Sequence, residues 1–121
     1  MKDGVGSYFY VDNGNVYRGE WRNNKRCGKG EFTHFKLREH YSGTFEDNKK
    51  HGFGEFTTRF GDKYIGEYQM GEKHGKGTIQ YNSGAVFEGI WEHDMAQGPG
   101  ELRYANGDMY RGNFEKGVRH G

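Results

Sequence analysis

The sequence predicts an all-β protein, built as one elongated, twisted, single-layer antiparallel β-meander of repeated hairpins. Three observations lead to this fold class. The chain repeats itself at intervals of 24, 23, 23 and 23 residues, which is the mark of a repeat array. Apolar and polar residues alternate with the period of two that is typical of strands. Hydrophobic residues make up only 31% of the chain although aromatic residues reach 17%, which favours an ordered but thin structure over disorder.

Each repeat unit begins at an aromatic residue. Full units cover residues 17–40, 41–63, 64–86 and 87–109, and partial units cover residues 1–16 and 110–121. We therefore expect one domain over residues 1–121. Because both ends cut through a unit, we also expect a fragment of a longer array, with open sheet edges that favour self-association.

Each unit is predicted to form one β-hairpin. In the first full unit, Tyr17, Gly19 and Trp21 share one face of a strand, because alternate residues point to the same side. The returning strand repeats the pattern in GKGEF, residues 28–32. Tight reversals then join successive hairpins at Asn13-Gly14, Phe60-Gly61, Ser83-Gly84 and Asn106-Gly107. Ten strands follow, counting one over residues 7–10, four hairpins and the first strand of a fifth.

Aromatic side chains are expected to cover glycines on the neighbouring strand. A ring over bare backbone offsets part of the stability that glycine costs a strand. A pairing that keeps both rows on one face sets Trp21 opposite Gly30 and Gly19 opposite Phe32. The same offset gives the pairs Phe45–Gly54, Tyr68–Gly77 and Trp91–Gly100.

The composition excludes several classes of protein. A net charge of +1 argues against a protein that coats nucleic acid. Cys27 is the only cysteine, so no intrachain disulfide can form, and a reducing, cytoplasmic location is expected. No run approaches 18 apolar residues and no apolar signal region begins the chain.

The segment GEKHGKGT, residues 71–78, resembles a phosphate-binding loop but departs from it at essential positions. Its first two glycines are one residue too close together, Lys76 is followed by glycine, and a strand follows instead of a helix. Cys27 has neither the oriented base nor the pocket that nucleophilic catalysis needs. We therefore expect no enzymatic activity and no cofactor.

The unit Y-x-G-x-W/F followed by K-x-H-G-x-G-x-(F/I/L) resembles the MORN repeat (membrane occupation and recognition nexus), and the resemblance covers essentially all 121 residues. It implies an elongated β-meander with a grooved aromatic face. It also implies a non-catalytic role in scaffolding, oligomer formation or partner docking, in cytoskeletal, cortical or membrane-associated settings. Contact with anionic phospholipids is a less secure implication, and some arrays of the family are attached to separate catalytic domains.

The aromatic face is the strongest candidate for binding a protein partner or a second copy of the chain, as in a homodimer. Rings that keep an exposed edge are efficient anchors for a partner. The predicted groove is formed by Tyr17, Trp21, Phe45, Tyr64, Tyr68, Phe87, Trp91, Tyr110 and Phe114.

A basic rim is the second candidate, and it would bind anionic lipids such as phosphoinositides. Each Lys or Arg near an anionic membrane contributes about 1 kcal/mol. The expected rim lies along the hairpin turns and contains Lys25, Arg26, Lys29, Lys49, Lys50, Lys73, Lys76 and Arg119. A solvated rim diluted by neighbouring acids is the alternative.

Histidines recur before the first glycine of the returning strand, as His51, His74 and His120. Equivalent residues in adjacent hairpins lie about 9–10 Å apart, which is too far for one ion within a chain. A metal bridging two chains is the remaining metal hypothesis, and a structural role at the turn is the default.

Two stretches depart from the repeat. FKLREH, residues 35–40, lacks the glycine of the reversal and is expected to project. In HDMAQGPG, residues 93–100, Pro99 removes a backbone donor that Lys29 and Lys76 provide. Taken together, the sequence predicts a non-enzymatic interaction scaffold. The alternatives are a membrane-surface adaptor and the targeting module of a larger enzyme.

Overall fold

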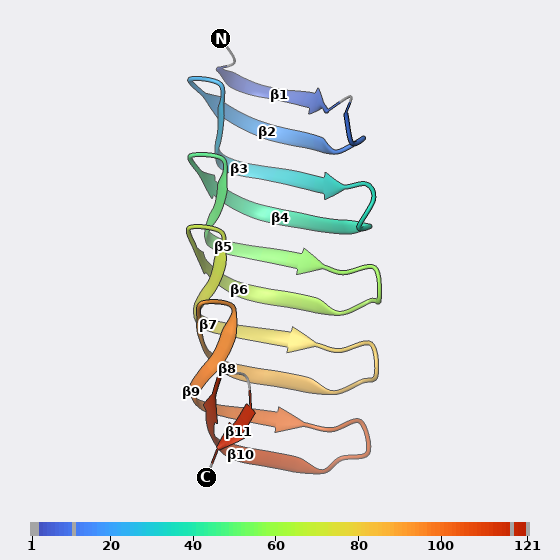
Figure 1. Ribbon diagram of the computed structural model, residues 1–121, viewed down its shortest axis with the longest axis vertical. Coiled ribbons are helices and arrows are strands. Elements are labelled where there is room, and N and C mark those ends of the chain that lie inside the picture. The colour runs from blue at the N-terminus through green and yellow to red at the C-terminus, as the bar shows by residue number, and fades with distance from the viewer. Residues whose placement is uncertain (1–2, 11, 117, 121) are drawn as a thin grey trace.

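The structure is a computed structural model that describes residues 3–10, 12–116 and, for the backbone alone, 118–120. The described residues form eleven strands in one antiparallel sheet, in chain order from one end to the other (Figure 1). The strands are β1 Gly4–Phe9, β2 Val16–Arg22, β3 Lys25–His34, β4 Glu39–Glu46, β5 Lys49–Thr57, β6 Lys63–Gln69, β7 Glu72–Gln80, β8 Val86–Glu92, β9 Met95–Arg103, β10 Met109–Glu115 and β11 Val118–His120. The predicted all-β meander is confirmed, with one strand more than the ten expected, because the chain returns once more as β11.

Two-residue turns close the hairpins at one side of the sheet. Both turn residues have positive φ, as at Asn23 (50°) and Asn24 (65°), which is the type I′ geometry that suits the twist of a hairpin. Equivalent turns lie at Asp47-Asn48, Met70-Gly71 and His93-Asp94. The turns therefore lie directly before Lys25 and Lys49, which begin the returning strands β3 and β5.

Longer loops join the hairpins at the other side (Figure 1). In one of them Tyr81 N donates to Ala85 O at 2.8 Å, and Gly84 has a φ of 98°. The glycine reversals predicted from the sequence are thus confirmed. In the loop at residues 35–38, Arg38 takes the positive φ of 55° in place of a glycine, and Phe35 projects with 67% of its surface exposed.

The register differs from the predicted one by two residues at Gly19 and by four at Trp21. Gly19 pairs with Gly30 and Tyr17 pairs with Phe32, whereas Trp21 pairs with Arg26. The prediction of Trp21 opposite Gly30 is wrong because the two-residue turn brings the strands together earlier than expected. The same correction applies to Phe45, Tyr68 and Trp91, whose strand partners are Lys50, Lys73 and Ala96.

A continuous row of glycines therefore crosses ten strands of the sheet. The row consists of Gly6, Gly19, Gly30, Gly43, Gly54, Gly66, Gly77, Gly89, Gly100 and Gly112. The ring that covers this row is the first aromatic of each unit: a Cβ added to Gly30 would collide with the Tyr17 ring, and one added to Gly77 with the Tyr64 ring. Glycine is required at these two positions because any side chain would collide with the tyrosine ring, and not because the backbone must be flexible.

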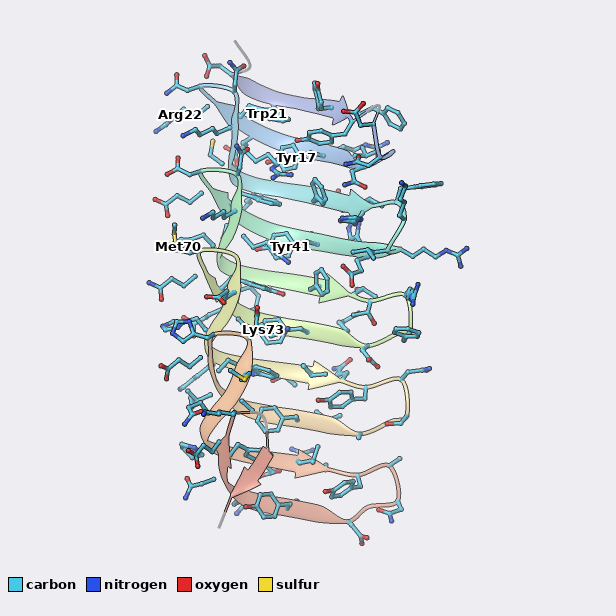
Figure 2. All side chains as sticks on the ribbon, viewed as in Figure 1. Tyr17, Trp21, Arg22, Tyr41, Met70 and Lys73 are labelled. Atoms are coloured by element: carbon cyan, nitrogen blue, oxygen red, sulfur yellow. The ribbon has the colours of Figure 1, made fainter. Side chains whose placement is uncertain are left out.

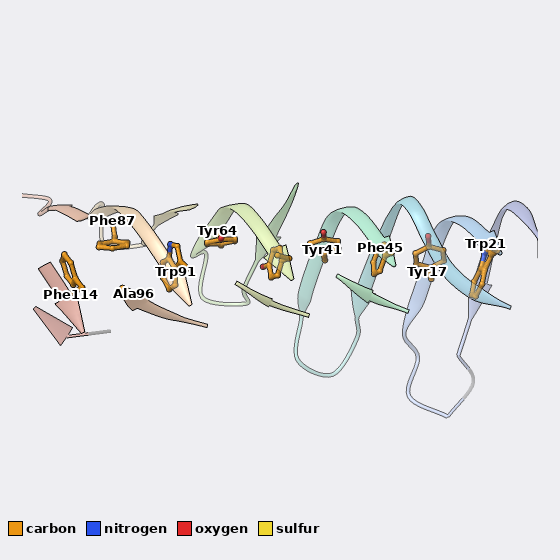
Figure 3. Packing of buried hydrophobic residues seen from close by; sticks show 10 residues of the cluster. Tyr17, Trp21, Tyr41, Phe45, Tyr64, Phe87, Trp91, Ala96 and Phe114 are labelled. Carbon is orange, nitrogen blue, oxygen red and sulfur yellow. The ribbon is translucent and has the colours of Figure 1, made fainter. Parts of the chain in front are cut away.

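A β-bulge next to the glycine row bends each hairpin. The register shifts between Gly19 and Trp21, between Gly43 and Phe45, between Gly66 and Tyr68, and between Gly89 and Trp91. The returning strand supplies a glycine with positive φ at each bulge, as at Gly75 (71°), because few other residues adopt that conformation. The bends turn the hairpin ends around the aromatic face, so that the ribbon arches over the rings (Figure 3).

The buried core is a single column of rings that runs the length of the array (Figure 3). Each ring meets the next edge to face: Tyr17 lies 4.9 Å from Trp21 and 5.1 Å from Phe45 between centroids, with interplanar angles of 80° and 86°. The contacts continue to Phe114 at the far end. Such pairs add about 0.5–1.5 kcal/mol each beyond the area that they bury, which explains how one sheet is stable without a second layer.

Candidate functional site

The rings predicted to form an open groove are the core of the protein. Eight of the nine, all except Tyr110, are no more than 7% exposed, and Tyr17 is fully buried. Tyr110 is partly buried against the same cluster. Tyr41, which the sequence analysis left out, is buried at 2% in the position equivalent to Tyr17. The exposed ring edges that we expected are therefore not present, and partner binding by these rings stays an untested prediction.

Hydroxyl and indole groups of five core rings are bonded to backbone oxygens, those of Tyr17, Tyr41, Tyr64, Trp21 and Trp91. The hydroxyl of Tyr17 donates to Glu20 O at 2.9 Å, and that of Tyr64 donates to Glu67 O at 2.9 Å. The indole nitrogen of Trp91 donates to Gly77 O at 3.1 Å. Burial raises the pKa of Tyr17 and of Tyr41 to about 12. The rings are thus fixed in place as neutral, hydrogen-bonded side chains.

Above the rings lies a row of cations that faces the concave side of the sheet. Arg26 Cζ lies 4.7 Å from the centroid of Phe32, and Lys50 Nζ lies 4.4 Å from that of Phe56. Lys73 Nζ lies 5.4 Å from Tyr64 and 5.5 Å from Trp91. These distances are within cation–π range. We call this concave surface, with its half-buried row Arg26, Lys50 and Lys73 over the rings, the trough.

Figure 2 shows where the trough lies in the array. Tyr17, Tyr41 and Lys73 fall in one column along the middle, whereas Arg22 and Met70 lie at the edge formed by the two-residue turns. Burial, and secondly the charge of Lys73, lower the pKa of the Lys50 ammonium group. Lys50 is therefore partly desolvated.

Each cation is held by the turn of the following hairpin. Arg26 N donates to Asn48 Oδ1 at 2.8 Å, and its Nη2 donates to Asn48 O at 2.8 Å. Lys73 N donates to Asp94 Oδ1 at 2.8 Å, and Gly71 N donates to Lys50 O at 2.8 Å. The hydrogen bonds between successive hairpins fix the backbone of the trough, so the cations keep a regular spacing along the array.

The fourth position of the row has no cation. Ala96 occupies it, is 6% exposed, and pairs with Trp91 as Lys73 pairs with Tyr68. A hollow of about 310 Å³ opens there, lined by Phe87, Leu102 and Phe114 and, on one side, by the Lys73–Asp94 pair. A second hollow of about 290 Å³ lies between Arg26 and Lys50. The cations of the trough therefore end at Lys73, and apolar side chains surround Ala96.

The predicted basic rim is divided among three places. Arg26, Lys50 and Lys73 face the trough, Lys25 and Lys49 are exposed beside the turns, and Lys29 and Lys76 are exposed on the outer face of the bulges. The side chain of Arg119 lies outside the described residues. The period of two along each strand separates neighbours such as Lys49 and Lys50. A single basic line is not formed, and lipid binding stays a prediction.

On the outer face, carboxylates bind the backbone of the bulge. Lys29 N donates to Glu20 Oε2 at 2.6 Å, and Lys76 N donates to Glu67 Oε2 at 3.0 Å. In the fourth unit Pro99 has no N–H, and Ile90 replaces the acid. The donor that Pro99 removes is therefore bonded to a carboxylate in the first and third units rather than to the strand ladder.

The histidine positions act at the turns. His51 Nδ1 faces Met70 N at 3.4 Å, and Gln97, at the equivalent place, accepts from Lys116 N at 3.0 Å. His74 is exposed, and the side chain of His120 lies outside the described residues. Among the described residues, no three His, Cys, Asp or Glu side chains are grouped to hold a metal ion. A metal shared between two chains stays untested.

The repeat pattern was compared with known families and proteins. The family model of the MORN repeat matches residues 17–34, 41–59, 64–86, 87–109 and 110–121. The chain belongs to the MORN-repeat family. MORN repeats are non-enzymatic modules that often take part in membrane or protein interactions. No curated protein matches the sequence. The described part of this MORN array contains no helix that could cross a membrane.

Proposed function

We propose that this MORN array is a non-enzymatic interaction module that binds a protein partner along the trough. One observation carries the proposal. The ring column stabilises the single sheet, and the side chains of the trough above it are regularly spaced and are covered by no second layer among the described residues. Partly buried apolar residues, Phe32, Phe56, Ile79 and Leu102, lie beside the ring column. Apolar surface next to fixed polar groups is typical of sites that bind peptides and proteins.

Partner binding is best tested by substitutions that leave the ring column intact. Replacing Trp21 or Trp91 would remove core rings and cost about 3–5 kcal/mol of stability, so lost binding could reflect unfolding. Ala96→Leu instead fills the apolar hollow without removing a ring or changing charge. Phe53→Ser is the matched control, because Phe53 is 62% exposed on the outer face of the sheet.

Self-association and partner capture should be measured on the same three proteins. Sedimentation velocity gives the oligomeric state, and quantitative affinity capture from cells compares the bound proteins. We expect Ala96→Leu to reduce association or to deplete specific bound proteins, and Phe53→Ser to leave both unchanged. Equal binding by the wild type and the Ala96→Leu variant, with both folded, would rule out the trough as the docking surface.

A further inference from the structure

The spacing of the trough cations matches that of an extended peptide. Arg26, Lys50 and Lys73 occupy equivalent positions in successive hairpins, so they lie two strands, or roughly 9–10 Å, apart. Three residues of polyproline II helix make one turn and rise about 9.3 Å, so every third side chain points to the same side. Every third side chain of a polyproline II segment along the trough would thus face one cation.

The charges of the row are incompletely neutralised within the chain. Lys73 Nζ has Asp94 Oδ1 at 3.9 Å. Among the described residues, no carboxylate oxygen lies within 4.0 Å of the side-chain nitrogens of Arg26 or Lys50. Both cations border the hollow of about 290 Å³, which Glu39 also lines without forming an ion pair with either of them. A carboxylate entering that hollow would meet partly desolvated positive charge, where an ion pair is stronger than on an open surface.

The fourth position requires a different side chain. Where Ala96 replaces the cation, Phe87, Trp91 and Phe114 border a hollow of about 310 Å³, together with Lys73 and Asp94. The exposed side chain of Met95 also lines it. Lys73 already faces Asp94 at 3.9 Å there, so a carboxylate would lose hydration and meet the negative charge of Asp94, whereas a leucine-sized side chain would bury its apolar surface.

We propose that the trough binds an extended acidic segment of a partner protein, with a carboxylate at every third residue opposite Arg26, Lys50 and Lys73 and an apolar side chain at the fourth register over Ala96. This inference rests on the proposed function and names the chemistry of the partner. A narrow peptide fits the recessed position of Lys73, whose side chain is 22% exposed, better than a flat membrane does.

The test uses the full chain and labelled synthetic peptides in fluorescence anisotropy. The probe contains three Glu-Pro-Pro triplets followed by leucine, because proline preforms the extended conformation. In one control peptide glutamine replaces each glutamate, and in another the three glutamates are consecutive. We expect the probe to bind at least about tenfold more tightly than either control at 50 mM salt, and more weakly as salt screens the pairs.

Two lysines on opposite faces of the sheet provide matched variants of the protein. Lys50→Met removes the ammonium of the trough but keeps an apolar stem over the rings, whereas Lys29→Met makes the same change in net charge at an exposed site on the outer face. We expect about tenfold weaker binding from the first and less than about twofold from the second. Lys50→Arg keeps the positive charge and should bind the probe as the wild type does, so it remains informative even if Lys50→Met alters the fold.

Three results would overturn the proposal: equal affinity for the glutamate and glutamine peptides, equal loss from both methionine variants, or binding to phosphatidylserine vesicles that needs Lys50 without any binding of the peptide. The vesicle result would instead favour a membrane ligand. If the peptides fail but Ala96→Leu still removes partner capture, the docking surface remains and only the chemistry assigned to its ligand is wrong.

Discussion

The backbone N–H of Lys76 donates a hydrogen bond of 3.0 Å to the carboxylate of Glu67 across the bulge of the β6–β7 hairpin. In the fourth unit the same two positions hold Pro99 and Ile90. Proline has no N–H to satisfy, so an apolar side chain can stand where the acid would accept. Backbone and side-chain chemistry therefore vary together between units of the array.

This relationship predicts a measurable coupling between the two positions. Pro99→Lys introduces an N–H that Ile90 cannot satisfy, and we expect a loss of about 1–2 kcal/mol of unfolding free energy. Adding Ile90→Glu should recover about 1 kcal/mol of that loss. Urea unfolding of the wild type, the two single variants and the double variant gives the coupling energy.

The double-mutant cycle also removes a competing explanation. Loss of proline makes the unfolded chain more flexible whatever residue 90 is, so this contribution cancels in the coupling energy. Additive effects of Pro99→Lys and Ile90→Glu would mean that the carboxylate does not stabilise the bulge.

The glycine row gives a second prediction, with its own control in the chain. Gly30→Ala would place a methyl group against the Tyr17 ring, and we expect a loss of about 1–3 kcal/mol from overpacking. At Gly6 no atom lies within 4 Å of an added Cβ. Gly6→Ala should therefore change the midpoint of thermal unfolding by less than about 1 °C, although both glycines belong to one row. A similar loss from both substitutions would exclude the steric explanation.

Much of the fold follows from the sequence, because its repeat and its alternation are independent signals. Together they predict the hairpin unit, the single sheet and the chain order of the strands. The register does not follow so easily. Asn23-Asn24 and His93-Asp94 form type I′ turns without glycine, and among the turns whose residues are all described, only Met70-Gly71 contains one. Since asparagine and aspartate also tolerate positive φ, these dipeptides were the sequence signal that could have located the turns and so the register.

The site was harder to predict because the register decides which cation lies beside which ring. With the turns at residues 23–24 and 47–48, Arg26 pairs with Trp21 and Lys50 pairs with Phe45. The alternation alone places each cation on the face of the rings, but it does not give these partners. The burial of those rings could not be deduced from strand alternation, because it depends on the bulges that bend each hairpin toward the aromatic face.

The tyrosine hydroxyls provide a reciprocal pair of substitutions. Tyr64→Phe removes the hydrogen bond to Glu67 O, and we expect a loss of about 1 kcal/mol because that buried oxygen is left with one partner fewer. Phe87 holds the equivalent place in the fourth unit without a hydroxyl. Phe87→Tyr should stabilise the array by roughly 0.5–1 kcal/mol. Both changes are measured by urea unfolding, and a loss from each would show that ring packing outweighs the hydroxyl bond.

Alkaline pH should unfold the array because the buried tyrosines resist ionisation in the folded state. Burial raises the pKa of Tyr17 and Tyr41 to about 12 from an ordinary value of 10.0. Their stabilising contribution is therefore complete below pH 10 and is lost as pH rises from about 10 to 12, by about 1.4 kcal/mol per pH unit for each group. Tyrosinate absorbance at 295 nm should rise together with loss of β-sheet circular dichroism, since these phenols ionise readily only after unfolding. Tyr41→Phe removes one such group and should make the loss of stability with pH shallower. Full ionisation near pH 10 with the sheet intact would contradict the burial of these rings.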